Sequence, residues 1–334
     1  MSRSSSPIAV LGAGSWGSAL AILLARNGHP VWLWGRDQAR MLALVEFRSN
    51  PQYLPGISFP EGIFPTGDLN VALAASSDVL VVVPSHGFRA TLEACARFRH
   101  VGVRLAWATK GLEPGTQRPF NEVAEEILGP ETPTAVVSGP TFAKEVVAGL
   151  PTAVTVASRF PDYARWLASC LRSPNFRPYT SDDMVGVQLG GAVKNVLAIA
   201  AGIADGLGFG ANARAALITR GLAEIMRLGE AMGGRRETFM GLAGLGDLVL
   251  TCTDDLSRNR RFGLLIGQGQ EINAALSAIG QVVEGFSTVR EVVVLAQRLR
   301  VDMPITNQVH AVLHADHNPH AAVQALLTRA LRPE

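Results

Sequence analysis

The feature that most constrains this chain is a glycine-rich turn near its N-terminus. The turn, Gly12-Ala13-Gly14-Ser15-Trp16-Gly17, follows a short β-branched run and opens a helical pattern. In that context the first glycine permits a tight turn and the second lets the backbone approach a pyrophosphate. The third lets helix and strand pack, while the helix N-terminus faces the anion. The pattern predicts a dinucleotide-binding βαβ unit rather than a merely glycine-rich turn.

The first half of the chain alternates short apolar runs with helical stretches, which is typical of parallel strands joined by crossover helices. We expect strands at 8–11, 31–34, 79–83, 105–108, 134–137 and 152–157. We expect helices at 15–27, 37–48, 88–98, 119–128 and 161–171, the second of which has Asp37 as its N-cap residue. The fold class of this half is therefore α/β, an N-terminal Rossmann doubly wound parallel sheet.

The second half changes character from about Asp182, where long helical patterns replace the β-type runs. These patterns cover 187–204, 211–231 and 288–299 and predict a C-terminal all-α domain. A chain of 334 residues is longer than one core of roughly 250 residues usually allows. We therefore expect two domains, an NAD(P)-binding domain at 1–185 and a helical substrate-binding and catalytic domain at 186–334.

Composition excludes several classes of protein. Hydrophobic residues make up 48% of the chain and charged residues 17%, and the net charge of +2 gives no broad basic surface for nucleic acid. The longest apolar run, 196–204, is far shorter than the roughly 20 residues of a membrane span. With no signal-peptide core and three widely separated cysteines, a cytoplasmic protein without stable membrane insertion is expected. The histidines at 310, 314, 317 and 320 fit a surface helix end better than a metal site, so no metal is expected.

Lysine is rare in this chain. Of its 30 basic residues only Lys110, Lys144 and Lys194 are lysines. Lys194 lies in an apolar helical pattern, where burial would move its pKa from about 10.4 to 7 or 8 at a cost of roughly 4 kcal/mol. Such a lysine is a candidate acid–base group, unless it reaches out along the helix surface. Asn195 points about 100° away and need not share its role.

Other polar residues follow strands or glycine-rich turns. Lys110 lies just past a predicted strand, at the edge where open α/β sheets bind ligands, and the segment 138–143 follows the next strand. Asp247 leaves a glycine-rich turn with Thr251 four residues later, so it could orient Lys194 or cap a helix. Arg258 and Asn259 suit the capture of a phosphate, although a solvated basic loop has the same pattern.

Cofactor preference is usually set at the end of the second strand, where an acid binds the ribose hydroxyl or an arginine accepts a 2′-phosphate. Gly35 occupies the expected position of the acid and Arg36 follows it. NADP is therefore favoured over NAD. Asp37 keeps NAD open, because it could bind the ribose or simply cap the next helix.

Six segments in order, GAGSWG, ATKG, SGPTFA, the GGAVKN helix, GLGDL and SRN, resemble the bacterial NAD(P)-dependent glycerol-3-phosphate dehydrogenase family. The resemblance spans nearly the whole chain and is more specific than the glycine pattern alone. It implies reversible reduction of dihydroxyacetone phosphate, a small phosphate ester, to sn-glycerol 3-phosphate. That product is the glycerol phosphate backbone for phospholipid synthesis.

The resemblance also implies roles for individual residues. Lys194 is similar to the family's catalytic lysine, with Asp247 beside it. The implied substrate residues are Lys110, Gly139, Thr141, Lys194, Asp247, Ser257, Arg258 and Asn259. The implied cofactor residues are Gly12, Gly14, Ser15, Trp16, Gly17, Arg36, Lys110, Ala143, Arg258, Val282 and Glu284. A homodimer stays open.

Two other functions fit parts of the pattern. A related dehydrogenase acting on a β-hydroxyacid would share the glycine turn and a lysine on a helix, but would not need Arg258 and Asn259. A non-enzymatic NADP-sensing protein would keep the first domain without a reason to place Lys194 in an apolar helix.

Overall fold

The computed structural model describes residues 6–98 and 103–329. The chain folds into two compact units. The first contains Met1–Thr109 and Phe120–Met184, and the second contains Lys110–Pro119 and Val185–Glu334. The segment 110–119 thus belongs to the second unit, although the sequence analysis placed it in the first domain.

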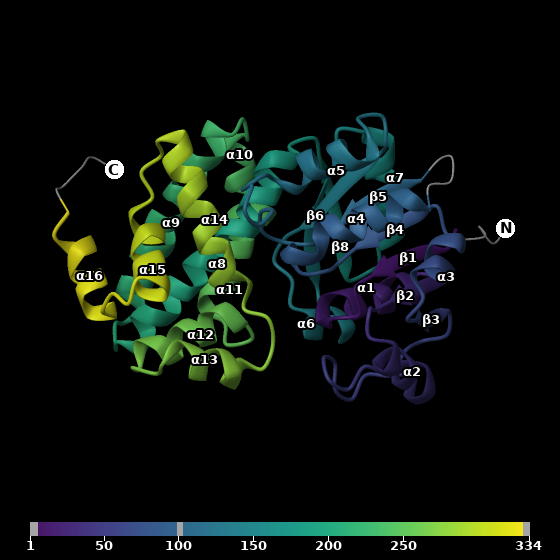
Figure 1. Ribbon diagram of the computed structural model, residues 1–334, viewed down its shortest axis with the longest axis horizontal. Coiled ribbons are helices and arrows are strands. Elements are labelled where there is room, and N and C mark those ends of the chain that lie inside the picture. Colours follow the sequence, from purple (N-terminus) through teal and green to yellow (C-terminus); the bar gives the residue numbers. More distant parts are fainter. Residues whose placement is uncertain (1–5, 99–102, 330–334) are drawn as a thin grey trace. The chain divides into compact units, whose positions relative to one another are not determined.

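An eight-stranded sheet forms the centre of the first unit, in the order β3-β2-β1-β4-β5-β6-β7-β8 (Figure 1). Its strands are β1 (Ile8–Leu11), β2 (Val31–Trp34), β3 (Ile63–Thr66), β4 (Asp78–Val81), β5 (Arg104–Trp107), β6 (Thr134–Ser138), β7 (Thr152–Ala157) and β8 (Phe176–Ser181). Strand order reverses beside β1, so the doubly wound prediction is confirmed. The sheet is mostly parallel, as expected, and the one antiparallel pair among its strands is β6 with β7.

Helices cover both faces of this sheet. They are α1 (Ser15–Arg26), α2 (Gln38–Phe47), α3 (Leu69–Ala74), α4 (Phe88–Arg97), α5 (Phe120–Leu128), α6 (Ala143–Val147) and α7 (Pro161–Leu171), with a 3₁₀ turn at Ser85–Gly87. One core joins alternate strand residues to α1, α6 and α7. On α4, Phe88 packs against Trp107 of β5 and Phe120 of α5, with ring centroids 5.7 and 4.1 Å away.

The apolar runs of the sequence did not indicate β3 and β8, which are the two edge strands. Each contains a proline, Pro65 in β3 and Pro178 in β8. Proline is tolerated at sheet edges because it cannot donate to the ladder, and edge strands lack the continuous apolar run of a buried strand. Because of these two features, the sequence pattern does not predict β3 and β8 as strands.

The described part of the second unit is helical, as predicted. Its helices are α8 (Met184–Gly206), α9 (Ala211–Ala231), α10 (Arg236–Phe239), α11 (Asp247–Thr253), α12 (Arg258–Gly267), α13 (Ile272–Ile279), α14 (Glu284–Leu299), α15 (Pro304–His314) and α16 (Pro319–Leu327). A π-helical turn, Leu242–Gly246, precedes α11. The α14 helix begins four residues before the expected 288.

Helix α8 forms the core of the second unit. By length and composition it could cross a bilayer, which the longest apolar run did not indicate, but the apolar stretch in question is entirely buried. A buried core helix meets the same criteria, so this is weak evidence for a membrane span.

Glycines bring α8 and α12 unusually close. A Cβ atom at Gly202 would collide with the carbonyl of Arg260, and one at Gly263 would collide with the carbonyl of Ile199. Because both obstacles are backbone atoms, neither helix can accept a larger residue without moving away from the other. This crossing fixes where α12 begins relative to Lys194 on α8.

Candidate active site

The glycine turn has the geometry that a dinucleotide requires. Gly12 has φ +126°, and a Cβ there would lie 2.5 Å from the carbonyl oxygen of Val82. A Cβ at Gly17 would collide with the carbonyl of Gly12. At Gly14, by contrast, an added Cβ would meet no described atom within 4 Å. The tight turn thus requires glycine at position 12, and the packing of α1 on the turn requires glycine at position 17. Gly14 leaves open space through which a ligand can approach the backbone.

The N-terminus of α1 is suited to an anion. Gly14 is its N-cap residue, and no described side chain caps this end. Ser15 and Trp16 begin the helix and are half-buried. The buried indole N–H of Trp16 finds no acceptor among the described residues. Uncapped amides at a helix N-terminus attract phosphate, so these residues fit the pyrophosphate of a dinucleotide.

The end of β2 is closely packed at position 35, where no acid stands. A Cβ at Gly35 would lie 2.6 Å from the sulfur of Met41. Arg36 beside it is exposed. Asp37 caps α2 by accepting the N–H of Arg40 at 3.0 Å, which confirms its predicted cap role. An exposed arginine without an acid at position 35 favours a 2′-phosphate over a free ribose hydroxyl.

Three further residues lie at the end of β6 in the first unit. Gly139 follows the strand with φ +152°, and a Cβ there would lie 3.0 Å from the Cα of Val154. The Thr141 hydroxyl donates to the Gly139 carbonyl at 3.2 Å, and Ala143 begins α6. These residues occupy the same sheet edge as the glycine turn, because β1, β4, β5 and β6 are parallel. Their contact with a substrate or cofactor remains a prediction.

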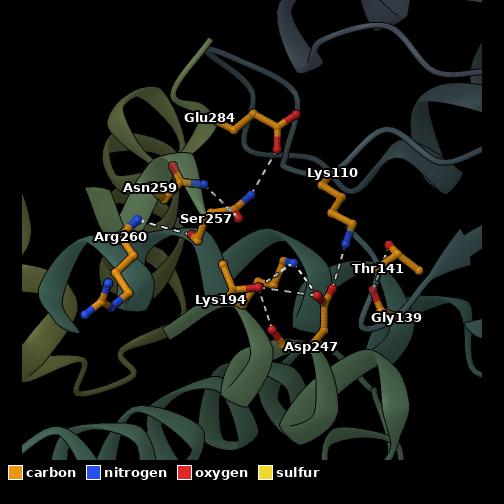
Figure 2. Close-up of polar contacts among 11 residues, drawn as sticks. Lys110, Gly139, Thr141, Lys194, Asp247, Ser257, Asn259, Arg260 and Glu284 are labelled. Carbon is orange, nitrogen blue, oxygen red and sulfur yellow. Dashed lines mark hydrogen bonds and ion pairs between the residues drawn. The ribbon is translucent and has the colours of Figure 1, made fainter. Parts of the chain in front are cut away.

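Two of the three lysines share one buried carboxylate, as Figure 2 shows. Lys194 on α8 donates to Oδ1 of Asp247, and Lys110 donates to Oδ2 at 2.6 Å. Lys194 also donates to the Thr251 hydroxyl at 2.8 Å, which confirms that Asp247 and Thr251 lie on one face. Lys194 is 6% exposed and Asp247 fully buried, so the predicted burial of Lys194 is confirmed. The third lysine, Lys144, is exposed.

The glycine-rich turn before α11 places Asp247 against Lys194. Its π-helical geometry widens the helix just before Asp247, a feature often found at functional sites. A Cβ at Gly190 on α8 would collide with the carbonyl of Ala243, and one at Gly244 with the carbonyl of Phe239. The small residues thus let the turn approach α8 closely enough for the ion pair.

The environment of Lys194 makes it a better proton donor than an ordinary lysine. Burial lowers the pKa of Lys194 from 10.5 to about 8, Asp247 opposes this effect, and the positive charge of Lys110 adds to it. A general acid works best with a pKa near the operating pH. The cluster therefore holds an ammonium that can give up its proton near neutrality.

A second polar network lies beside the lysines. The Asn195 side-chain amide donates to Glu284 at 3.0 Å and accepts from Asn259 at 3.0 Å. The Asn259 side-chain oxygen in turn accepts the N–H of Gly285 at 2.9 Å. Asn195 thus does point away from Lys194, but it links α8 to the starts of α12 and α14. The position of Asn195 on the helix predicts that its side chain points away from Lys194. The sequence does not predict which residues it contacts.

The predicted phosphate residues occupy the start of α12. Ser257 is the N-cap residue and accepts the N–H of Arg260, while Arg258 and Asn259 form the first turn. This end therefore combines the N–H groups of a helix N-terminus with a half-buried guanidinium, as phosphate binding requires. Arg260, which the sequence analysis did not single out, is buried and pairs with Asp205 at 2.6 Å and with Asp255.

The segment that carries Lys110 is attached to α14. Leu112 enters the core of the second unit. The Gly115 N–H and the Gln117 side-chain amide both donate to the same carboxylate oxygen of Glu291, at 3.1 and 2.7 Å. Lys110 therefore belongs to the same unit as Lys194, although its strand belongs to the other.

The remaining predicted residues differ in setting. Val282 is 48% exposed just before α14. The rings of two of the histidines, His310 and His314, are tilted by 53° to each other with centroids 5.3 Å apart. Within residues 6–98 and 103–329, no group of three or more His, Cys, Asp or Glu side chains could hold a metal ion.

Comparison with known proteins agrees with this geometry over almost the whole chain. Residues 7–164 match the N-terminal family model of NAD-dependent glycerol-3-phosphate dehydrogenase, and residues 183–324 match its C-terminal model. The chain is 60% identical over 328 residues to a glycerol-3-phosphate dehydrogenase [NAD(P)+] of Thioalkalivibrio sulfidiphilus, covering 98% of each protein. It is 55% identical to that of Stenotrophomonas maltophilia, covering 100% of this chain and 98% of the relative.

The fold agrees as well. A crystal structure of glycerol-3-phosphate dehydrogenase from Coxiella burnetii superposes with a TM-score of 0.95 at 49% identity, covering 98% of this chain and 100% of that one. The chain therefore belongs to the NAD-dependent glycerol-3-phosphate dehydrogenase family.

Proposed function

We propose that this chain reversibly reduces dihydroxyacetone phosphate to sn-glycerol 3-phosphate with NAD(P)H, using Lys194 as the proton donor and acceptor. The observation that carries this proposal is the buried cluster of Lys194, Lys110 and Asp247. A sensor of NADP would not need an ammonium with a pKa of about 8 in the core of its helical unit.

The two halves of the chain divide the work. Residues 1–185, without the segment 110–119, bind the dinucleotide through the glycine turn, Arg36 and Ala143. Residues 186–334 together with 110–119 carry the proton donor Lys194 and most of the substrate residues. When bound, the reduced nicotinamide supplies a hydride to the substrate carbonyl carbon.

Lys194 acts on the carbonyl oxygen. Its ammonium donates a hydrogen bond there, stabilises the developing negative charge and transfers the proton. Asp247 and Thr251 accept its other hydrogens and so fix the direction of the donated one. Arginine could not replace this lysine, because a guanidinium does not lose its proton near neutral pH.

The phosphate of the substrate lies at the start of α12. The Arg258 side chain and the helix amides at Arg258 and Asn259 bind it, beside the N-cap residue Ser257 and with Lys110 in the same unit. The other substrate residues that the resemblance implies, Gly139 and Thr141, belong to the first unit. These contacts hold the substrate in a reactive orientation, which converts binding energy into rate. The Asn259 side chain is already bonded to Asn195 and Gly285, so it also holds the start of α12 in place.

The product supplies the glycerol phosphate backbone for phospholipid synthesis. We place the reaction in the cytoplasm, with a homodimer as one assembly the sequence leaves open. A phosphate ester recognised at a helix N-terminus needs no nucleic acid or metal partner.

The test follows NADPH absorbance with purified protein and either dihydroxyacetone phosphate or dihydroxyacetone. We expect NADPH to be oxidised with dihydroxyacetone phosphate and hardly at all with dihydroxyacetone. The rate with NADH in place of NADPH should be lower. Lys194→Met is expected to lower kcat by about 10² to 10⁴ with unchanged NADPH affinity. Lys144→Met makes the same change at an exposed site and is the matched control.

Two results would contradict the proposal. A Lys194→Met variant with most of its activity would remove Lys194 from the proton transfer. NADPH binding without reduction of any phosphate ester would favour the sensor. NADPH oxidation that needs the oxo acid corresponding to a β-hydroxyacid would favour the related dehydrogenase.

A further inference from the structure

The glycine turn is hydrogen-bonded to a segment around Asn50, which lies more than thirty residues away in sequence. Asn50 follows α2 and is fully buried. Its side-chain amide donates to the Ala13 carbonyl oxygen at 3.1 Å and to the Ser18 hydroxyl at 2.7 Å. Both of its hydrogens are thus used on the turn and on the helix that follows.

Arg40 on α2 makes a second bond to the same carbonyl. Its Nη2 donates to the Ala13 oxygen at 2.6 Å and to the Asn50 side-chain oxygen at 3.3 Å. The guanidinium lies over the ring of Tyr53, 4.3 Å from its centroid. The backbone carbonyl of Asn50 accepts the N–H groups of Tyr53 and Leu54, so the segment has its own rigid turn.

The direction of this carbonyl decides what the turn offers a ligand. The peptide bond between Ala13 and Gly14 is planar and trans, so its C=O and N–H point in opposite directions. With the oxygen held against Asn50 and Arg40, the Gly14 N–H points the other way. A rotated peptide would present an oxygen, which repels a phosphate, in place of the donor.

We propose that Asn50 and Arg40 are positioning residues for the cofactor, because they fix the Ala13–Gly14 peptide with its N–H toward the pyrophosphate. This inference rests on the proposed function, in which the glycine turn holds NAD(P). Neither residue needs to touch the cofactor, and Asn50 cannot, since it is buried behind the turn.

The main test substitutes Asn50→Leu, which removes both donors at similar volume, leaves the charge unchanged and keeps the backbone bonds of Asn50. Calorimetry compares the binding of NADPH with that of adenosine 2′-monophosphate, which carries the 2′-phosphate but no pyrophosphate. We expect the Kd for NADPH to rise about tenfold, as for one lost charge-assisted hydrogen bond. Binding of the monophosphate is expected to be unchanged.

The matched control is Arg48→Met. Arg48 donates to the carbonyls of Ile63 and Pro60 and so stabilises the same segment without contacting the turn. This variant is expected to bind NADPH as the wild type does. Unchanged NADPH affinity in Asn50→Leu, or an equal loss for adenosine 2′-monophosphate, would overturn the inference.

A second variant tests the same positioning role if Asn50→Leu does not fold. Arg40→Met removes the other donor, and NADH serves as its ligand because it carries no 2′-phosphate. We expect weaker NADH binding than in Arg48→Met, which loses the same charge; equal affinities would overturn the inference. Failure of the wild type to bind either dinucleotide would instead contradict the proposed function.

Discussion

Lys194 and Lys110 share one carboxylate, and this arrangement makes the acidity of Lys194 depend on its neighbour. Two ammonium groups lie beside the single carboxylate of Asp247 in a buried place. The charge of Lys110 therefore helps to lower the pKa of Lys194. Lys110 thus has a second effect besides its proposed contact with the substrate.

The pH dependence of the reaction tests this coupling. Reduction needs the ammonium form of Lys194, so kcat/KM for dihydroxyacetone phosphate should fall above pH about 8, while oxidation of glycerol 3-phosphate should rise there. In Lys110→Met the pKa of Lys194 should be higher, so the alkaline limb should move to higher pH. Profiles of both directions measure the shift.

Lys144→Met, at an exposed lysine, controls for the general loss of one positive charge. This variant should have the alkaline limb of its pH profile at the same pH as the wild type. A Lys110→Met profile with its limb unmoved or at lower pH would show that Lys110 does not influence Lys194.

The sequence predicted individual residues where composition made them stand out. Lys194 was conspicuous because lysine is rare and its helix is apolar. Arg260 was not, since it shares a polar stretch with Arg258 and only the register of α12 turns one inward to Asp205. Asn50 lies in an ordinary turn sequence, and its role depends on a fold contact with Ala13 that no local pattern encodes.

At the scale of elements, the crossing of α8 and α12 connects the proposed proton donor to the proposed phosphate site. Gly263 of α12 lies against the backbone of Ile199, five residues after Lys194 on α8. The start of α12 carries Ser257 and Arg258. A change in helix spacing would therefore move the start of α12, where we propose that the phosphate binds, away from Lys194.

Gly263→Ala tests this geometry. Overpacking against backbone should lower the free energy of unfolding by about 1–3 kcal/mol, as measured by chemical denaturation. The KM for dihydroxyacetone phosphate should rise more than the Kd for NADPH, because Arg258 is the one implied cofactor residue on α12. The control is Gly210→Ala, where φ is −84° and an added Cβ would meet no described atom within 4 Å. Equal effects of the two substitutions would show that the crossing does not position the phosphate site.

Elements were predictable where both faces of a strand or one face of a helix are buried. The inner strands β1, β2, β4, β5 and β6 follow from continuous apolar runs. The antiparallel pairing of β7 with β6 does not, because strand direction depends on how residues 139–151 return to the sheet. The start of α14 at Glu284 was missed because its first turn carries no apolar periodicity.

At the scale of the whole molecule, burying the ammonium of Lys194 opposes stability. A group with a lower pKa in the folded state stabilises the fold only above its unfolded pKa, and this contribution is lost as the pH falls through the folded value. For Lys194 those values are 10.5 and about 8. The difference corresponds to a penalty of about 3 kcal/mol at neutral pH.

Removing the ammonium should therefore stabilise the protein while it abolishes proton transfer. In Lys194→Met, Asp247 keeps Lys110 as its partner, so no buried carboxylate is left unpaired. Its melting temperature at pH 7 should exceed that of the wild type by several degrees. The excess should shrink as the pH rises from about 8 toward 10.5, because the wild-type lysine then loses its charge in the unfolded state as well.

Thermal denaturation at several pH values measures this effect, and Lys144→Met again controls for the change in net charge. A Lys194→Met variant that melts below the wild type at pH 7 would mean that the ion pair and its hydrogen bonds outweigh the burial. A difference that does not change between pH 8 and 10.5 would mean that Lys194 titrates alike in the folded and unfolded chain. Either result would remove the physical basis for Lys194 as a donor with a pKa near neutrality.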